Sequence, residues 1–562
     1  MLHHISMRQK ILVMIAVMSG LFLVALDQTI ISTALGKIVE EFNSFSSLGF
    51  VVTAYLLTST VTVPLAGKFS DMFGRRKVLL TGVIIFTLGS LMSGVSGNIE
   101  QLILYRAIQG IGGGIIMANA FTIIGDLFTP RERGKWQGLF GAVFGLASVV
   151  GPLLGGFLTD AHNIFGLTTD WRWTFFINIP IGIFSAIIIA RYCPSIKHDK
   201  KHYLDYAGAA TLTLALSSLV LAVDNTDLIF KGLIDNGVSL TLIKTILFSF
   251  AAVMSALFVF AESRARQPII PLRFFKNRTF TSVMIAALLF GAAFLGAILY
   301  LTQFNQQVFG VDATDAGLML LPFMGGMIAA SMTVGQIVSR TGKYKSFILV
   351  GFSIATAGIF ALSFLVPTSP YWHEAVIMVF IGMGMGTAMP IMNLAVQNEF
   401  EQHDLGAATS SSQLFRGLGS TIGTAVLSGI LTVGVTAGIG DIQNSAYVQS
   451  LRKSPEASQM LGDTIDANSV LQINAQRETI SEQANKALDA APIPTQVKDA
   501  QKEQFAKNQT EFKDTVVNAF SDSLHTVFYV SAGLMVLALV AVSFVREKKL
   551  RDGHNDAPGV AE

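Results

Sequence analysis

The sequence predicts an all-α integral membrane protein with two related halves and fourteen transmembrane helices. Of its 562 residues, 51% are hydrophobic and only 14% are charged, so the chain is far more apolar than a soluble globular protein. The apolar residues form runs of at least ~17 residues, the length that spans a bilayer as a helix. A short motif also recurs at corresponding points of the two halves, which indicates an internal repeat.

The expected spans follow from these apolar runs. Six lie near residues 11–33, 49–66, 78–96, 102–124, 137–159 and 173–192. Eight more lie near residues 207–223, 241–261, 280–302, 316–338, 346–366, 373–396, 406–432 and 524–545. The first run continues without a small-residue cleavage site, so we expect an uncleaved first helix and not a signal peptide.

Lysine and arginine residues gather in alternate short loops. These loops include residues 67–77, 131–135, 264–278, 340–345 and 546–551. Positive residues stay on the cytoplasmic side of a membrane, so both termini are expected in the cytoplasm of the cell, which agrees with an even number of spans. The loop Gln397–Asp404 is acidic and departs from this pattern.

The repeated motif lies at Gly67–Lys77 and again at Gly335–Lys345. In both copies glycine is first and eighth, and cations follow the second glycine. The repeat predicts an N-terminal half (1–205) and a C-terminal half (279–562), each of six helices, with two inserted helices and a linker between them (206–278). Transporters built from repeats place their site at the repeat interface near the middle of the membrane.

One substantial segment, residues 433–523, lies outside the predicted spans and on the extracellular side. It is polar and contains the break Ala491-Pro492-Ile493-Pro494. Apolar residues recur at helical spacing before the break, as at Ile480, and after it, as at Phe512, so a helical hairpin is expected. The alternative is a disordered loop, which low hydrophobicity also permits.

Asp27 lies inside the first span, in the segment Leu26–Gly36. A charge at membrane depth costs ~2.5 to 3.5 kcal/mol even on the most lenient scale, so such a residue indicates a functional site by default. The alternative is a structural carboxylate that is tied to one basic partner. In the second half the corresponding position falls near Leu295, so this acid is present in one half only.

Arg106 in the fourth span is the expected partner of Asp27. Counted from the same side of the membrane, the two residues lie at depths of ~9 and ~12 Å at 1.5 Å per residue, so they can meet. A neighbouring arginine lowers a carboxyl pKa, whereas apolar surroundings raise it. Movement between these environments would load and release a proton, and Gln109, one turn from Arg106, can orient either group.

The loop after the second span combines Gly67, Asp71, Gly74 and Arg75. An acid beside cations at a helix end can pair with them or cap a helix N-terminus. This arrangement suits a latch that holds two helical ends together in one conformation and releases them in another. The alternative is a simple positively charged membrane anchor, which we favour for the two cations that follow Arg75.

Several of these motifs resemble the major facilitator superfamily, in particular its branch of fourteen-helix drug:proton antiporters, which includes bacterial quaternary-ammonium exporters. The motifs that carry the resemblance are Gly67–Lys77, Leu104–Gly110, Gly138, Gly151-Pro152, Gly155-Gly156, Leu26–Gly36 and Trp171–Pro180. They occur in the family's order and cover nearly all spans. The resemblance implies two six-helix halves that work by alternating access in a bacterial plasma membrane.

The fifth span contains what resembles the antiporter motif, with Gly151, Pro152, Gly155 and Gly156. Such residues permit close helix approach and a kink. The direction of transport is implied by the resemblance alone, because plain helix packing explains the glycines equally well. Ala147 stands where the motif usually has another glycine, and we expect only a slight change in packing.

A substrate cavity is expected between the halves. Its candidate residues are Gln28, Tyr55, Gln109, Phe294, Tyr300, Phe323, Met389, Asn393 and Arg416. Methionine and aromatic side chains suit a polyspecific pocket, because methionine adapts to many shapes. Arg416 has no obvious intramembrane acid in its half, so it is either a structural bridge to carbonyls or a residue that tunes the potential of the cavity.

Several function classes are excluded. The chain has no G-x-x-x-x-G-K-[ST] phosphate loop, no metal-ligand spacing and no nucleophile elbow, and its single cysteine, Cys193, rules out internal disulfides. We therefore expect a transporter and not an enzyme. It would use the proton gradient without a cofactor, act as a monomer in the lipid bilayer, and bind no nucleic acid. The expected substrates are lipophilic cations or other amphipathic small molecules.

Two alternatives remain open at this point. One is the same fold exporting a specific native lipid, peptide or metabolite, with drugs as incidental substrates. A different class is a membrane sensor or assembly protein that uses the extracellular hairpin to bind a partner.

Overall fold

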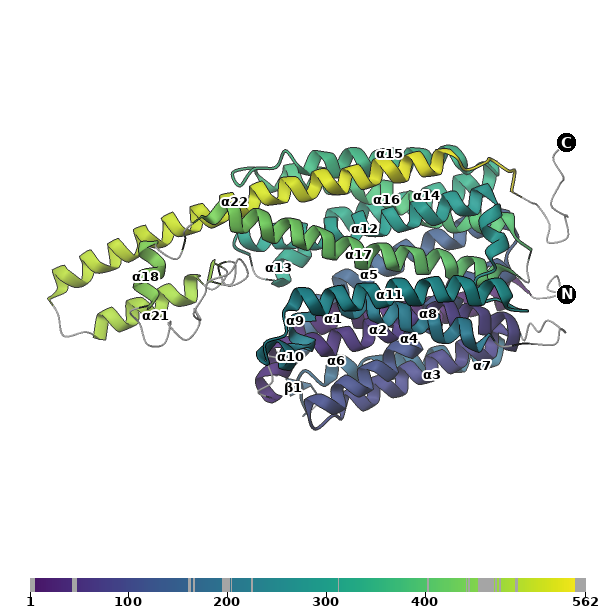
Figure 1. Cartoon of the computed structure of the whole chain (residues 1–562), viewed down its shortest axis with the longest axis horizontal. Helices are drawn as coiled ribbons and strands as arrows, with labels where there is room; N and C mark the ends of the chain where they lie inside the picture. Colours follow the sequence, from purple (N-terminus) through teal and green to yellow (C-terminus); the bar gives the residue numbers. More distant parts are fainter. Residues whose placement is uncertain are drawn as a thin grey trace.

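The computed structural model describes residues 6–42, 48–159, 163–164, 167–194, 203, 205–223, 226–311, 313–401, 404–440, 442, 445–452, 470, 473–474, 477–490 and 494–550. Within these residues, fourteen helices are long and apolar enough to cross a membrane. The predicted all-α architecture is therefore confirmed, and the helices run side by side as one elongated bundle (Figure 1).

The N-terminal half holds the first six spans. They are α1 (Met7–Phe42), α2 (Leu48–Phe73), α3 (Arg75–Gly94), α4 (Ile99–Leu127), α5 (Pro130–Thr159), and the pair α6 (Trp173–Phe176) and α7 (Asn178–Tyr192). A break at Ile177 divides the sixth span between α6 and α7. The short strands β1 (Asn163–Ile164) and β2 (Leu167–Thr168) pair antiparallel between α5 and α6, with Asn163 opposite Thr168.

The inserted helices lie beside the N-terminal half. They are α8 (Tyr206–Val223) and α11 (Leu240–Arg264), with α9 (Thr226–Ile229) and α10 (Lys231–Asp235) between them and the 3₁₀ helix η2 (Leu272–Lys276) after them. Helix α8 packs on α11 and α2. Large apolar side chains of α11 such as Ile246 and Phe260 are exposed, as expected for a helix at the lipid-facing periphery.

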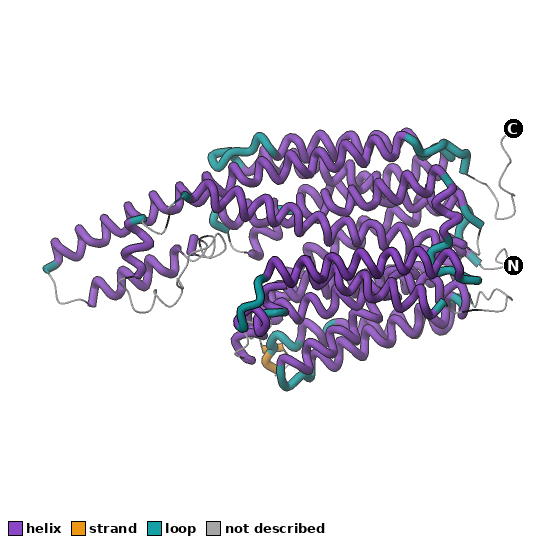
Figure 2. Tube along the Cα trace, in the orientation of Figure 1, coloured by secondary structure: helices purple, strands orange, loops and turns teal. Residues whose placement is uncertain are grey.

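The C-terminal half begins at α12 (Arg278–Val308). It continues with α13 (Ala313–Leu318), α14 (Leu321–Thr341), α15 (Lys345–Leu362), α16 (Tyr371–Glu399), α17 (Leu405–Ile439), α18 (Ala446–Arg452), α21 (Arg477–Ala490) and α22 (Thr495–Ser543). The 49 residues of α22 span about 74 Å at 1.5 Å per residue. This helix therefore extends well beyond the bundle (Figures 1 and 2).

Part of the extramembrane segment packs around Tyr447 of α18. The ring of Tyr447 lies 5.4 Å from that of Phe505 and 4.9 Å from that of Phe512, both on α22. Gln509 of α22 donates hydrogen bonds to the Tyr447 hydroxyl (3.1 Å) and to the carbonyl of Arg477 (2.8 Å), where α21 begins. Helices α21 and α22 thus pair beyond the bundle. The Pro-containing turn at residues 491–493 lies outside the described residues.

The internal repeat is visible in helix contacts. In α4, Gly110 and Gly114 lie against α2, and Gly112 lies against α3, so closely that a Cβ would collide with the facing backbone. In α16, Gly382 and Gly386 lie in the same way against α14, and Gly384 lies against α15. The two sets are related by a constant shift of 272 positions. Helices α4 and α16 are therefore equivalent central helices of their halves.

We define the terminal end of the bundle as the end where α1 begins and α22 ends, and the far end as its opposite (Figure 1). At the terminal end the halves are closed. A Cβ on Gly67 of α2 would collide with Ser410 of α17, and Gly134 of α5 packs directly on Gly335 of α14. Eleven residues beyond Gly406, Gly417 has no atom within 4 Å of its Cβ position. Helices α2 and α17 therefore diverge toward the far end.

The acidic loop at residues 397–404 is neutralised by neighbouring segments. Glu399 accepts a hydrogen bond from Lys548 Nζ (2.6 Å) after α22, and Asp404 pairs with Arg273 of η2 (2.8 Å). Leu550 also donates a backbone hydrogen bond to the carbonyl of Gly342 (3.2 Å). The loop thus binds cations from two other segments, which explains why it lacks cations of its own.

A polar contact joins α1 to α6 at the far end. Glu41 accepts hydrogen bonds from Arg172 Nη2 (2.7 Å) and Trp171 Nε1 (2.6 Å). The hydrogen bond from Arg172 lowers the pKa of Glu41 below its ordinary value of 4.5. A lowered carboxyl pKa adds stability above the ordinary value, and this stability is lost as the pH falls through the lowered value.

We expect Glu41→Gln to lower the thermal unfolding temperature slightly at pH 7. The loss should correspond to less than about 1 kcal/mol, because the Glu41 side chain is 43% exposed and screened by solvent. In detergent at a pH well below 4.5, the variant and the parent should unfold at the same temperature. A difference that persists at low pH would assign the effect to packing instead.

The single cysteine is a useful internal standard. Cys193 follows α7 and is 3% exposed, and burial raises the pKa of its thiol from 9.0 to about 12. At neutral pH roughly a thousandfold fewer thiolates are then available for alkylation. We expect maleimide to modify Cys193 slowly in the folded protein and rapidly in denaturing detergent, as measured by mass spectrometry. Rapid modification of the folded protein would contradict the buried position.

Candidate functional site

The deepest charges of the N-terminal half form an ion pair. Asp27 Oδ2 of α1 lies 2.6 Å from Arg106 Nη1 of α4, and each side chain is 1% exposed. The contact expected from the depths of the two residues is therefore present. An ion pair buried this deeply is retained only when further hydrogen bonds satisfy its remaining polar atoms.

Two amides complete the coordination of Asp27. Gln109 donates to Asp27 Oδ1 (2.8 Å) and accepts from Arg106 Nη1 (2.8 Å). Asn178, the first residue of α7, also donates to Asp27 Oδ1 (3.2 Å) and to the Ser90 hydroxyl of α3 (3.0 Å). The carboxylate is thus held by side chains of α4 and α7. Four helices, α1, α3, α4 and α7, contribute to one buried polar cluster.

Aromatic rings cover the guanidinium group. The ring centroid of Tyr55 in α2 lies 4.4 Å from Arg106 Cζ, and that of Phe175 in α6 lies 5.8 Å away. Both distances allow a cation–π attraction, which grows when the pair is desolvated. Tyr55 and Gln109, predicted as cavity residues, therefore belong to the Asp27 cluster. Gln28, the next residue after Asp27, is exposed.

Helix α5 approaches α1 closely beside this cluster. Thr29 Oγ1 donates to the carbonyl of Ala147 (3.0 Å), and a Cβ on Gly151 would collide with the same hydroxyl. Gly151 is thus required for this contact. Pro152 lies near Gly317 of α13, whereas Gly156 has no atom within 4 Å of its Cβ position. Gly155 is buried, and its carbonyl accepts from Thr159 (2.8 Å).

A second charge cluster lies at the terminal end. Arg75 Nε of α3 lies 2.7 Å from Asp126 Oδ2 of α4, and Arg75 Nη2 lies 2.5 Å from Asp71 Oδ1 of α2. Arg75 also donates to the Ser70 hydroxyl. Gly74 connects α2 to α3 with φ of 95°, a conformation that favours glycine. The arginine therefore joins three helix ends within the N-terminal half.

Asp71 extends this cluster to the C-terminal half. Its Oδ2 accepts a hydrogen bond from the backbone N–H of Ala407 (3.1 Å), in the first turn of α17. This turn has unpaired N–H groups and a positive dipole end, which favour a carboxylate. A Cβ on Gly406 would collide with both carboxylate oxygens, and a Cβ on Gly67 would lie 3.0 Å from the Gly406 carbonyl. Both glycines are needed for this closure.

A polar cluster around Gln397 also bridges the halves at the terminal end. Its amide nitrogen donates to the carbonyl of Phe121 in α4 (3.1 Å), and its carbonyl accepts from Gln137 of α5 (2.9 Å). Arg131 of α5 donates to the carbonyls of Ser339 (3.0 Å) and Arg340 (2.9 Å) at the end of α14. The terminal end is thus closed by hydrogen bonds on both sides of the bundle.

The remaining cavity candidates do not form one group. Tyr300 and Phe323 are each 2% exposed and lie in the core of the C-terminal half, and Asn393 is 3% exposed. Phe294 and Met389 are half-buried. Of these five side chains, Phe294 and Met389 alone leave part of their surface accessible.

Arg416 of α17 is half-buried beside the point where α2 and α17 diverge. Its Nη2 donates to Gln413 Oε1 (2.7 Å), and its Nη1 lies 3.9 Å from the Met389 sulfur. Among the described residues it has no carboxylate partner, and its Nε makes no hydrogen bond. This geometry differs from that of Arg106, whose charge is neutralised by Asp27.

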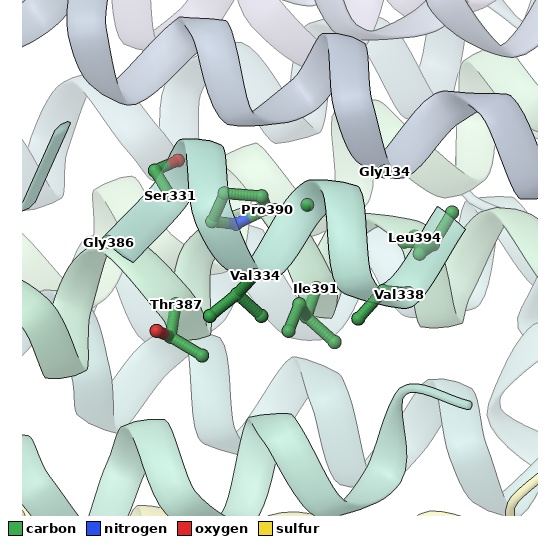
Figure 3. A pocket seen from close by; sticks show the side chains of 10 residues that line it. Gly134, Ser331, Val334, Val338, Gly386, Thr387, Pro390, Ile391 and Leu394 are labelled. Atoms are coloured by element: carbon green, nitrogen blue, oxygen red, sulfur yellow. The ribbon is translucent and has the colours of Figure 1, made fainter. Parts of the chain in front are cut away.

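A small enclosed space lies between α5, α14 and α16, lined by residues such as Gly134, Ser331 and Pro390 (Figure 3). Its volume of about 10 Å³ corresponds to about one water molecule. It is a packing void at the closed crossing of α5 and α14, so it is not a substrate site. Among the described residues, no group of His, Cys, Asp and Glu side chains is arranged to hold a metal ion.

The comparisons with known proteins agree with this architecture. The sequence profile of the Major Facilitator Superfamily matches residues 17–424. The chain belongs to the major facilitator superfamily. Members of this superfamily are membrane transporters, so the chain is a multi-pass transporter and not an enzyme.

Relatives in Bacillus subtilis are named as drug transporters. The chain is 35% identical to "Multidrug transporter protein MdtP" over 538 residues, covering 95% of this chain and 92% of the relative. It is 36% identical to "Multidrug resistance protein 3" over 420 residues, covering 75% and 79%. These matches support a superfamily efflux transporter. The proton:xylose symporter XylE shares the fold, with a TM-score of 0.58, 14% identity, and 96% and 97% coverage.

Proposed function

We propose that this transporter is a proton-coupled multidrug antiporter that exports lipophilic, chiefly cationic compounds by alternating access. The observation that carries the proposal is the ion pair of Asp27 and Arg106, which is fully buried in one half of a transporter fold. A buried ion pair that merely stabilised the protein would be replaced by apolar side chains at little cost. Its retention at membrane depth therefore supports a role in the transport cycle.

The proposed orientation places the terminal end in the cytoplasm, because the cation-rich loops lie there. The structure then corresponds to a state that is closed toward the cytoplasm, with α2 and α17 diverging toward the outside. In this state the Asp27 carboxyl group is paired with Arg106 at 2.6 Å. Protonation from outside removes the charge of Asp27 and weakens its pairing with Arg106. Helices α1 and α4, which carry the two residues, can then move relative to one another.

Asp71 acts as the latch of the same cycle. In the closed state it joins α2 to the first turn of α17. Its neighbours Arg75 and Asp126 fix its position. When the halves rock in the opposite direction, Asp71 exchanges the Ala407 N–H for water. Release of this contact and release of the Asp27 proton toward the cytoplasm would then occur in the same conformation.

The substrate would bind between the halves, where Gln28, Phe294, Met389 and Arg416 are available. Methionine and phenylalanine provide adaptable apolar contacts for several compounds. Arg416 limits the positive charge that this region accepts, so divalent cations should be exported poorly. A second candidate is export of a specific native lipid, peptide or metabolite. Arg416, which has no carboxylate partner among the described residues, favours this candidate if that compound carries an acidic group.

The test is proton movement in proteoliposomes after addition of a monovalent lipophilic dye. An encapsulated pH indicator should report proton movement opposite to dye movement, and a protonophore should abolish dye accumulation. Dye binding without proton movement would contradict proton coupling and favour a different native substrate. Efficient proton-dependent export of a bis-quaternary compound would contradict the expected preference for monovalent cations.

A further inference from the structure

The C-terminal half contains a buried carboxyl group that the proposed cycle does not use. Glu374, in the first turn of α16 at the far end, is 1% exposed. Neither of its carboxyl oxygens meets a hydrogen-bond partner among the described residues. The polar side chain that interacts with it is Asn305 of α12, which is 0% exposed and has an unpaired amide oxygen and nitrogen.

The repeat indicates what this position holds in the other half. The shift of 272 positions that superposes the glycines of α4 on those of α16 places Glu374 opposite Leu102, which is 0% exposed. It also places Met378 opposite Arg106. The C-terminal half therefore lacks the arginine of the Asp27 cluster. It has its own acid one turn before Met378, at a position where the N-terminal half has an apolar side chain.

No cation neutralises Glu374 within the described residues. Helices α12, α14 and α15 carry their Arg and Lys residues at the terminal end, and α16 has none. Titratable and charged side chains on the described elements at the far end of this half include Asp315, Tyr371, His373, Arg477, Asp522 and His525, and Arg477 lies beside Gly310, just after α12. Of these, Tyr371 donates its hydroxyl to the Met319 carbonyl (2.8 Å), and His525 contacts the Leu365 carbonyl (2.6 Å).

An ionised carboxylate in this place would be desolvated without a cation or a hydrogen-bond donor in position. Leaving a buried charge unpaired is strongly unfavourable, so such a group binds a proton instead. Glu374 is therefore a neutral carboxylic acid in this conformation. The equivalent position of the N-terminal half is filled by Leu102, so the repeat itself does not require a polar group here.

We propose that Glu374 is a second protonation site of the transport cycle. It holds a proton taken from outside while it is buried against Asn305, and it passes that proton toward the cytoplasm when the halves rock to the opposite conformation. The two buried acids are thus neutralised differently in the same state: Asp27 by Arg106, and Glu374 by a proton. This inference rests on the proposed proton-coupled function, and it predicts more than one proton moved per transport cycle.

The first test measures protonation without transport. Infrared difference spectra of the purified parent protein should show the carbonyl band of a protonated carboxyl group at neutral pH. This band should disappear in Glu374→Gln and persist in Asp27→Asn. Glu100→Gln is the matched control, because Glu100 is an exposed residue in the first turn of the equivalent helix α4. A spectrum unchanged by Glu374→Gln would overturn the proposal.

The second test counts protons moved per dye molecule in proteoliposomes. The count should fall by one in Glu374→Gln and in Glu374→Leu, which copies Leu102, and it should not change in Glu100→Gln. An unchanged count in both Glu374 variants would leave a protonated but static acid and overturn the proposal. If the parent moves no protons with dye, proton coupling itself fails and the transport role of Glu374 fails with it, while the infrared result still reports its protonation.

Discussion

Asp27→Asn is expected to abolish proton-coupled export while the protein remains in the membrane. The asparagine cannot take up or release a proton, so dye would no longer move against its gradient when a pH gradient is imposed. The substitution also leaves the Arg106 charge buried without its partner, which costs about 3 to 5 kcal/mol in buried ion pairs. We therefore expect a lower unfolding temperature as well, and the two effects must be separated.

The double variant Asp27→Asn with Arg106→Gln separates them. Both charges are removed, so much of the lost stability should return, because replacing a whole buried pair is far cheaper than breaking it. Coupled transport should stay absent, since no proton-binding group remains in the cluster. Thermal unfolding and proton movement with dye are measured for all variants. Intact coupled transport in the double variant would refute the role proposed for Asp27.

The contact between Asp27 and Arg106 was predictable because depth in a membrane is fixed by counting residues along a helix. The same holds for the number of spans and for the repeated loop, where the eighth glycine of each copy, Gly74 and Gly342, has a positive φ. Length, charge distribution and backbone conformation are local properties of the sequence. They required no knowledge of which helices are neighbours.

The side-chain contacts that the sequence did not reveal depend on which helices pack against one another. Asn178 lies in a recognised motif, yet its hydrogen bond to Asp27 depends on the packing of α7 against α1. Asp126 has no local signal for its pairing with Arg75. Tyr300 and Phe323 were expected in a cavity but are buried in the core. A helix that is apolar on all sides gives no periodicity from which its inner face can be assigned.

Gly406→Ala is expected to prevent closure of the terminal end. A Cβ at Gly406 would collide with the Asp71 carboxylate, which approaches the first turn of α17 at this point. Extra atoms in a packed contact cost about 1 to 3 kcal/mol, which corresponds to roughly a 5- to 150-fold loss of the closed state relative to the open one. Export should fall strongly, because each cycle must pass through the closed state.

The change is measured with Thr409→Cys as a reporter. Thr409 is 1% exposed and accepts a hydrogen bond from Gln397 within the closed contact (3.4 Å), and the native Cys193 is also buried. Maleimide labelling of this reporter should be slow in the parent and faster with Gly406→Ala. Gly417→Ala is the matched control, because it adds the same atom to α17 where nothing lies within 4 Å.

Equal labelling with both alanines would mean that the contact of Asp71 with α17 does not hold the halves together. Faster labelling with Gly406→Ala and with Asp71→Asn, but not with Gly417→Ala, would locate the latch in the hydrogen bond between the Asp71 carboxylate and the Ala407 N–H. The first two variants alter this hydrogen bond from its two sides.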